Sequence, residues 1–202
     1  MNSHSGIVRD KVSTGTMVAV VGPSGAGKDS LLAIAMAHFA GRPDVHFVQR
    51  VITRPEDAGG EKHICVSSPE FEAMRAQGAF AVDWDAHGLR YGIPASVHEK
   101  LALGHMVIAN GSRSALPRWA QAFSPLLIIN VTASPEVLAG RLVARGRETR
   151  DEILHRLNRS SLTIEGNYDV VTIDNSGVLA EAGAKLISIL ERVLAGRSQA
   201  ET

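Results

Sequence analysis

The sequence predicts a single α/β domain in which a mostly parallel central sheet is flanked by helices. Short apolar runs alternate with helical patterns along the chain, and a glycine-rich turn joins the first run to the first helix. The length of 202 residues suits one compact core. These patterns occupy residues 17–196, whereas the polar residues 1–16 and 197–202 are expected to form a flexible leader and a tail.

The expected strands are short runs rich in Val, Ile and Leu. They cover residues 17–21, 45–53, 64–66, 80–84, 89–91, 106–109, 126–131 and 170–173. The expected helices carry apolar residues at helical spacing, and two of them open at Ser-Pro, a typical helix start. They cover about residues 28–40, 68–78, 94–103, 116–123, 134–145, 151–164 and 178–194.

The composition limits the partners and the compartment that we expect. Lys plus Arg and Asp plus Glu both number 21, so the chain has no global field for nucleic acid or an acidic membrane. Cys65 is the only cysteine, which excludes an internal disulfide and fits a reducing cytoplasm. The first 16 residues lack the apolar core of a signal peptide. The sequence leaves open whether the chain forms a homodimer.

The glycine-rich turn from Gly22 to Lys28 reads GPSGAGK and matches the pattern G-x-x-x-x-G-K. Glycines let backbone N–H groups approach phosphates closely, and the start of the following helix favours an anion. Lys28 supplies a mobile charge for the β- and γ-phosphates of a nucleotide. The pattern therefore predicts a P-loop NTPase fold, with ATP bound by Gly22, Pro23, Ser24, Gly25, Ala26, Gly27, Lys28, Asp29 and Ser30.

The residue after the loop lysine is Asp29, where a Ser or Thr that binds Mg²⁺ is usual, and Ser30 follows it. Our hypothesis is that Asp29 or Ser30 contacts Mg²⁺ directly or through water. The alternative is that Asp29 only stabilises the positive end of the helix.

The GPSGAGK form resembles the loop of guanylate kinases, and the GKDS variant at 27–30 resembles ribose 1,5-bisphosphate phosphokinases of phosphonate metabolism. Further segments agree with that family in order and spacing, namely ITR at 52–54, W-x-A-x-G-L-x-Y-G at 84–92, NGSR at 110–113 and RGRE at 145–148. The resemblance spans about residues 17–190. It implies a kinase that uses ATP and Mg²⁺ to convert a small phosphorylated sugar, ribose 1,5-bisphosphate, into 5-phosphoribosyl 1-diphosphate (PRPP).

Two alternatives remain. The first is guanylate kinase itself, although the stretch RPEDAGGEKHI lacks that family's second Arg and has His63 where a Tyr is expected. The acidic residue that reads guanine would fall near Asp83. The second is a non-catalytic guanylate-kinase-like binding module, but such modules typically lose the phosphate loop that this chain keeps.

Arginines gather between residues 141 and 159, a stretch that we expect to fold as an Arg-rich lid over the transferred phosphoryl group. The alternative is a solvated helix surface with ion pairs between successive turns. By resemblance, Arg145 and Arg156 join Lys28 as the catalytic residues.

The acceptor is expected to bind in a subregion at about residues 45–95. The candidate acceptor ligands follow strand ends or match family segments, and they are Arg50, Arg54, Tyr91 and Arg113. Asn175, after the last strand, is expected from the resemblance to contact adenine. An ionised phosphate acceptor needs no general base, so we assign none.

Overall fold

The computed structural model describes residues 15–55, 61–144, 164 and 166–198. Its central sheet has five strands in the order β2-β7-β1-β8-β9, and every neighbouring pair is parallel. The strands are β2 (Val45–Phe47), β7 (Met106–Asn110), β1 (Met17–Val21), β8 (Leu126–Thr132) and β9 (Asp169–Asp174). The predicted α/β class with a mostly parallel sheet is confirmed.

β1 lies at the centre of this sheet and all five of its residues are buried. Alternate side chains point to opposite faces, so Val18 and Val20 join one core cluster while Met17, Ala19 and Val21 join another. An all-apolar strand is what a position covered by helices on both faces requires.

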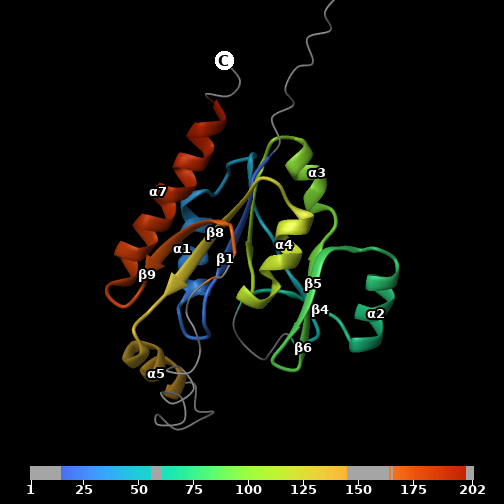
Figure 1. Ribbon diagram of the computed structural model, residues 1–202, viewed down its shortest axis with the longest axis horizontal. Coiled ribbons are helices and arrows are strands. Elements are labelled where there is room, and N and C mark those ends of the chain that lie inside the picture. The colour runs from blue at the N-terminus through green and yellow to red at the C-terminus, as the bar shows by residue number, and fades with distance from the viewer. Residues whose placement is uncertain (1–14, 56–60, 145–163, 165, 199–202) are drawn as a thin grey trace, which may run out of the picture.

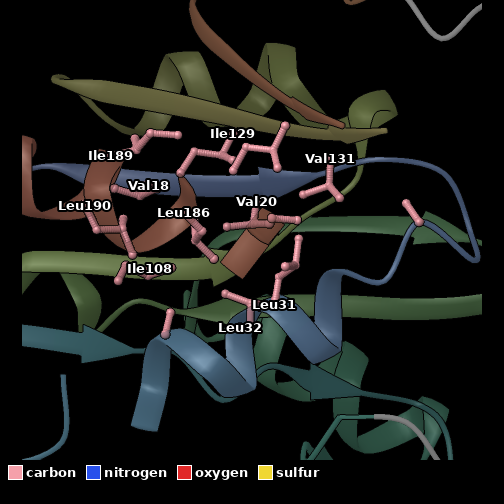
Figure 2. Packing of buried hydrophobic residues seen from close by; sticks show 14 of the residues in the cluster. Val18, Val20, Leu31, Leu32, Ile108, Ile129, Val131, Leu186, Ile189 and Leu190 are labelled. Carbon is pink, nitrogen blue, oxygen red and sulfur yellow. The ribbon is translucent and has the colours of Figure 1, made fainter. Parts of the chain in front are cut away.

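Helices form the outer layers (Figure 1). On one face, α1 (Lys28–His38) packs against the long α7 (Leu179–Ser198), and Figure 2 shows Leu31, Leu186 and Leu190 among the packed side chains. On the other face, α4 (Leu116–Ala122) buries Trp119 completely, and α3 (Val97–Ala102) buries Val97. α5 (Pro135–Val143) follows β8, and Ser134 caps it as the Ser-Pro pair predicts. No helix in the described ranges is long and apolar enough to cross a membrane.

A second sheet of four strands has the order β4-β3-β6-β5. Its strands are β4 (Ile64–Cys65), β3 (Val51–Ile52), β6 (Leu89–Pro94) and β5 (Phe80–Ala86), and α2 (Ser68–Ala76) lies beside them (Figure 1). β5 and β6 form a hairpin whose two turn residues, His87 and Gly88, both have positive φ, as a tight hairpin turn requires.

The single strand expected at residues 45–53 is wrong in one respect. The run divides into β2 in the central sheet and β3 in the second sheet, and Arg50 lies in the crossing. Apolar periodicity reports that both pieces are buried but does not report which sheet each piece joins. The crossing places the start of the second sheet next to the phosphate loop.

Candidate active site

The phosphate loop runs from the end of β1 to the start of α1. Gly22, Gly25 and Gly27 all have positive φ, at 148°, 84° and 89°. A Cβ on Gly22 would lie 2.1 Å from the backbone oxygen of Val131 on the neighbouring strand. The loop can therefore follow this path only with glycine at its first position.

Lys28 is folded back over its own loop. Its Nζ donates hydrogen bonds to the carbonyl oxygens of Gly22 at 2.8 Å and Pro23 at 3.1 Å. These carbonyls hold the ammonium group inside the turn of the loop, where the motif places the phosphates of a nucleotide.

The electrostatic surroundings lower the pKa of Lys28 from 10.5 to about 8. Burial of the ammonium group is the main cause; Asp29 opposes it, whereas Arg50 and Arg113 add to it. An anion placed among these three cations would favour the charged form of Lys28. The site is thus built to receive negative charge.

Two side chains donate hydrogen bonds to backbone carbonyls of the phosphate loop. Asn175 donates from Nδ2 to the carbonyl of Ala26 at 2.7 Å, and Arg141 donates to the carbonyls of Gly25 at 3.3 Å and Ala26 at 3.4 Å. Arg141 also donates to the backbone oxygen of Asn175 at 2.9 Å. These bonds connect the loop to α5 and to the end of β9.

A cleft of about 230 Å³ lies in front of the loop. Its walls come from three places: the phosphate loop with Lys28 and Asp29, the end of β7 and the following turn at residues 110–112, and the acceptor side. On the acceptor side, Arg50 comes from the crossing between β2 and β3, and Trp84 and Tyr91 come from the second sheet. The cleft therefore joins the nucleotide loop to the expected acceptor region without a break.

Arg50 forms the acceptor side of the cleft. Its guanidinium carbon lies 5.0 Å from the ring centre of Tyr91 and 5.8 Å from that of Trp84, and the two rings stack on each other with centroids 5.4 Å apart. Its Nε donates a short hydrogen bond to Glu61 Oε1. Within the described residues, its two terminal nitrogens make no hydrogen bond, so both can bind phosphate oxygens as a fork.

Asn110 connects the two sides of the cleft. It ends β7, and its Nδ2 donates to Asp29 Oδ1 at 2.9 Å and to Glu61 Oε2 at 2.8 Å. The second oxygen of Asp29 has no hydrogen bond in the described part of the chain.

The sequence model of the guanylate kinase family matches residues 14–193 of this chain. The chain belongs to the guanylate kinase family. Within it, the chain is 61% identical to a ribose 1,5-bisphosphate phosphokinase PhnN of Rhizobium etli, over 90% of this chain and 92% of the relative. It is 56% identical to a protein of the same name from Agrobacterium fabrum, over 91% of this chain and all of the relative.

A solved guanylate kinase from Anaplasma phagocytophilum has the same fold, with a TM-score of 0.63 at 17% identity, over 89% of this chain and 86% of that one. The relatives of both kinds are named as kinases, so this chain is a member of a kinase family. The resemblance inferred from the motifs, and the fold and enzyme class that it implies, are confirmed.

The cleft brings together many of the expected family ligands. Lys28, Asp29, Ser30, Arg50 and Tyr91 line it, and the half-buried Arg113 is near enough to lower the pKa of Lys28. Burial also lowers the pKa of Arg113 itself. The expected catalytic residues Arg145 and Arg156 lie outside the described residues, as does most of the expected lid.

Two candidates lie elsewhere than expected. Asn175 is only 1% exposed and donates to the loop backbone, so its side chain supports the loop and has no open surface for adenine. Arg54 does not appear among the described residues that line the cleft. Its Nη2 lies 3.3 Å from Nδ1 of His63, whose Nε2 lies 2.8 Å from the Arg54 carbonyl, so this pair closes a local turn.

Sequence reasoning missed Asn110 and Glu61, and it expected Arg141 in the lid, whereas its side chain contacts the backbone of the phosphate loop. Asn110 carried a usable signal, because polar residues at the carboxyl ends of parallel strands often line a ligand site. Glu61 stands in a polar stretch where nothing distinguishes it from solvated neighbours. Only the folded chain brings Glu61 to Asn110 and Arg50.

Asp83, the position closest to a guanine-reading acid, does not face the cleft. Trp84 lines the cleft, and successive strand residues point to opposite faces. The carboxylate of Asp83 receives a short hydrogen bond from Arg75 and lies 3.5 Å from Arg118. The negative charge of Asp83 is therefore compensated by arginines on the face of β5 that points away from the cleft.

Proposed function

We propose that this protein transfers the γ-phosphoryl group of ATP to the 1-phosphate of ribose 1,5-bisphosphate, which yields PRPP and ADP in phosphonate degradation. The observation that carries the proposal is the continuous cleft, which has Lys28 at one side and the guanidinium fork of Arg50 at the other. The names of the relatives at 61% and 56% identity support the same acceptor.

The reaction needs alignment and charge compensation more than proton transfer. A phosphate monoester has its second pKa near ~6, so the acceptor is largely a dianion at neutral pH. One of its oxygens attacks the γ-phosphorus, the bond from the γ-phosphorus to the β,γ-bridging oxygen breaks, and ADP leaves. Lys28 exchanges the carbonyls of Gly22 and Pro23 for β- and γ-phosphate oxygens, while Arg50 and Arg113 hold the acceptor.

Asp29 fits a magnesium ion. It is exposed at the cleft, one carboxylate oxygen is held by Asn110, and the other has no hydrogen bond in the described part of the chain. Mg²⁺ in kinases binds one or two carboxylates together with substrate phosphates, and Ser30 lines the same cleft. When bound, the ion would compensate charge on the phosphates.

The lid at residues 141–159 is part of this proposal. Arg141, its first residue, already contacts the phosphate loop from α5. Arg145 and Arg156 are the proposed lid residues over the γ-phosphoryl group, and such a lid would keep water from accepting that group. The single exposed Cys65 fits a reducing compartment, so we infer a cytoplasmic enzyme.

Product analysis tests the proposal. The protein is incubated with ATP and Mg²⁺ plus either ribose 1,5-bisphosphate or GMP, and products are identified by mass. We expect PRPP with the sugar and little GDP with GMP, because Asp83 is turned away from the cleft and paired with arginines. A preference for GMP, or no transfer to the sugar, would refute the proposal.

A further inference from the structure

Asn110 is a buried amide between two carboxylates. It is 5% exposed, and its single NH₂ group donates one N–H to Asp29 and the other to Glu61. The reversed amide would place Asn110 Oδ1 against two carboxylate oxygens, so charge alone determines its orientation. Asn110 Oδ1 is buried without a hydrogen-bond partner among the described residues, which costs stability and suggests a role beyond packing.

The bridge extends to the acceptor side. The oxygen of Glu61 that does not bind Asn110 accepts from Arg50 Nε, and the side chains of Glu61 and Arg50 are only 18% and 11% exposed. A continuous chain of hydrogen bonds thus runs from Asp29 beside the nucleotide loop, through Asn110 and Glu61, to Arg50. Charge-assisted bonds of this kind are strong and directional when shielded from water.

We propose that Asn110 is a positioning residue that fixes the guanidinium fork of Arg50 through Glu61 and ties it to the nucleotide side through Asp29. The inference rests on the proposed function. Asparagine suits the position because its neutral NH₂ group can serve both carboxylates at once. An aspartate would lose both hydrogen bonds and add a third negative charge.

A polarity swap tests the proposal. In Asn110→Asp, the new carboxylate repels Glu61. In Glu61→Gln, the new amide has one oxygen for two donors, Asn110 Nδ2 and Arg50 Nε. In the double variant, the amide at position 61 can donate to the carboxylate at position 110 and still accept from Arg50. The hydrogen bonds that join position 110, position 61 and Arg50 are then restored. The donor and acceptor roles between positions 110 and 61 are exchanged, and the total charge is unchanged.

We expect each single substitution to raise the KM for ribose 1,5-bisphosphate, and its Kd by calorimetry, about tenfold or more. In the double variant, the factor by which KM and Kd rise over the wild type should be well below the product of the two factors found for the single variants. The KM for ATP should change less in Glu61→Gln than the KM for the acceptor, because that substitution leaves Asp29 in place.

Asn130→Asp is the matched control, since Asn130 is another buried asparagine, on β8, and does not line the cleft. It should lower the melting temperature without the selective rise in acceptor KM. Strictly multiplicative effects in the double variant, or an equal rise in both KM values for Glu61→Gln, would overturn the role of Asn110. A wild-type protein that forms no PRPP would instead refute the proposed function, and the role of Asn110 with it.

Discussion

The Nζ atom of Lys28 lies 2.8 Å from the carbonyl oxygen of Gly22, the residue that begins its own phosphate loop. The ammonium group thus lies inside the turn and donates hydrogen bonds to backbone carbonyls. A nucleotide that enters must replace those partners with phosphate oxygens, which carry more negative charge and compete well.

The first prediction concerns this lysine. Lys28→Ala should lower kcat by orders of magnitude, because the variant loses the cation that compensates charge on the transferred group. The melting temperature should change little, since the substitution also removes the cost of a partly buried charge. Steady-state kinetics and thermal unfolding measure the two effects. Lys185→Ala, at an exposed site on α7, is the control, and near-normal turnover in Lys28→Ala would remove Lys28 from the mechanism.

The second prediction is a pH dependence. The pKa of Lys28 is about 8 in the free protein, so its charge is present below that pH and lost above it. The kcat/KM for ATP should therefore fall above about pH 8, because this ratio reports groups of the free enzyme. The fall in kcat should begin at higher pH, since bound phosphates favour the ammonium form. In Lys28→Arg, neither kcat/KM for ATP nor kcat should show this fall at alkaline pH.

The same pKa has a consequence for stability. The unfolded chain keeps the lysine proton up to its ordinary pKa of 10.5, whereas the folded chain releases it from about 8. The unfolded state thus binds more protons in this window, and the folded protein gains stability as pH rises through it. Relative to Lys28→Met, the free energy of unfolding of the wild type should increase between pH 8 and 10.5. A constant difference in urea unfolding would contradict the shift.

The third prediction concerns Arg50. Arg50→Lys keeps the charge but cannot hold Glu61 and present a two-pronged fork at the same time. We expect the KM for ribose 1,5-bisphosphate to rise about tenfold, with a smaller change in the KM for ATP. Arg42→Lys is the control, because Arg42 makes an exposed ion pair with Asp44. Equal effects of the two substitutions would argue against acceptor binding by Arg50.

The fourth prediction compares two glycines with similar backbone angles. Gly27 has φ 89° and a Cβ there would lie 2.4 Å from Asn175 Nδ2, whereas Gly41 has φ 82° and open space around it. Gly41→Ala should cost about 1 kcal/mol of unfolding free energy from the backbone alone. Gly27→Ala should cost roughly 2–4 kcal/mol, because it also breaks the buried bond from Asn175 to Ala26.

Nucleotide binding separates these two variants further. Gly27→Ala should lose most of the rise in melting temperature that ATP produces, while Gly41→Ala should keep it. Equal loss of stability in both variants would show that Asn175 does not hold the loop in the way that its hydrogen bond indicates.

By itself, the sequence determined the strand, loop and helix from Met17 to His38, the α/β class and the kinase family. These follow from local patterns: the glycine spacing of the loop, the alternation of apolar runs and the Ser-Pro helix start all act within a few residues.

Only the tertiary structure decided the division of residues 45–53 between two sheets, the burial of Asn175 beneath the loop and the bridge from Asp29 through Asn110 to Glu61. Those partners are far apart along the chain. A local pattern shows that a side chain is buried or polar, but its partner depends on strand order and on how the two sheets meet, which local spacing does not specify.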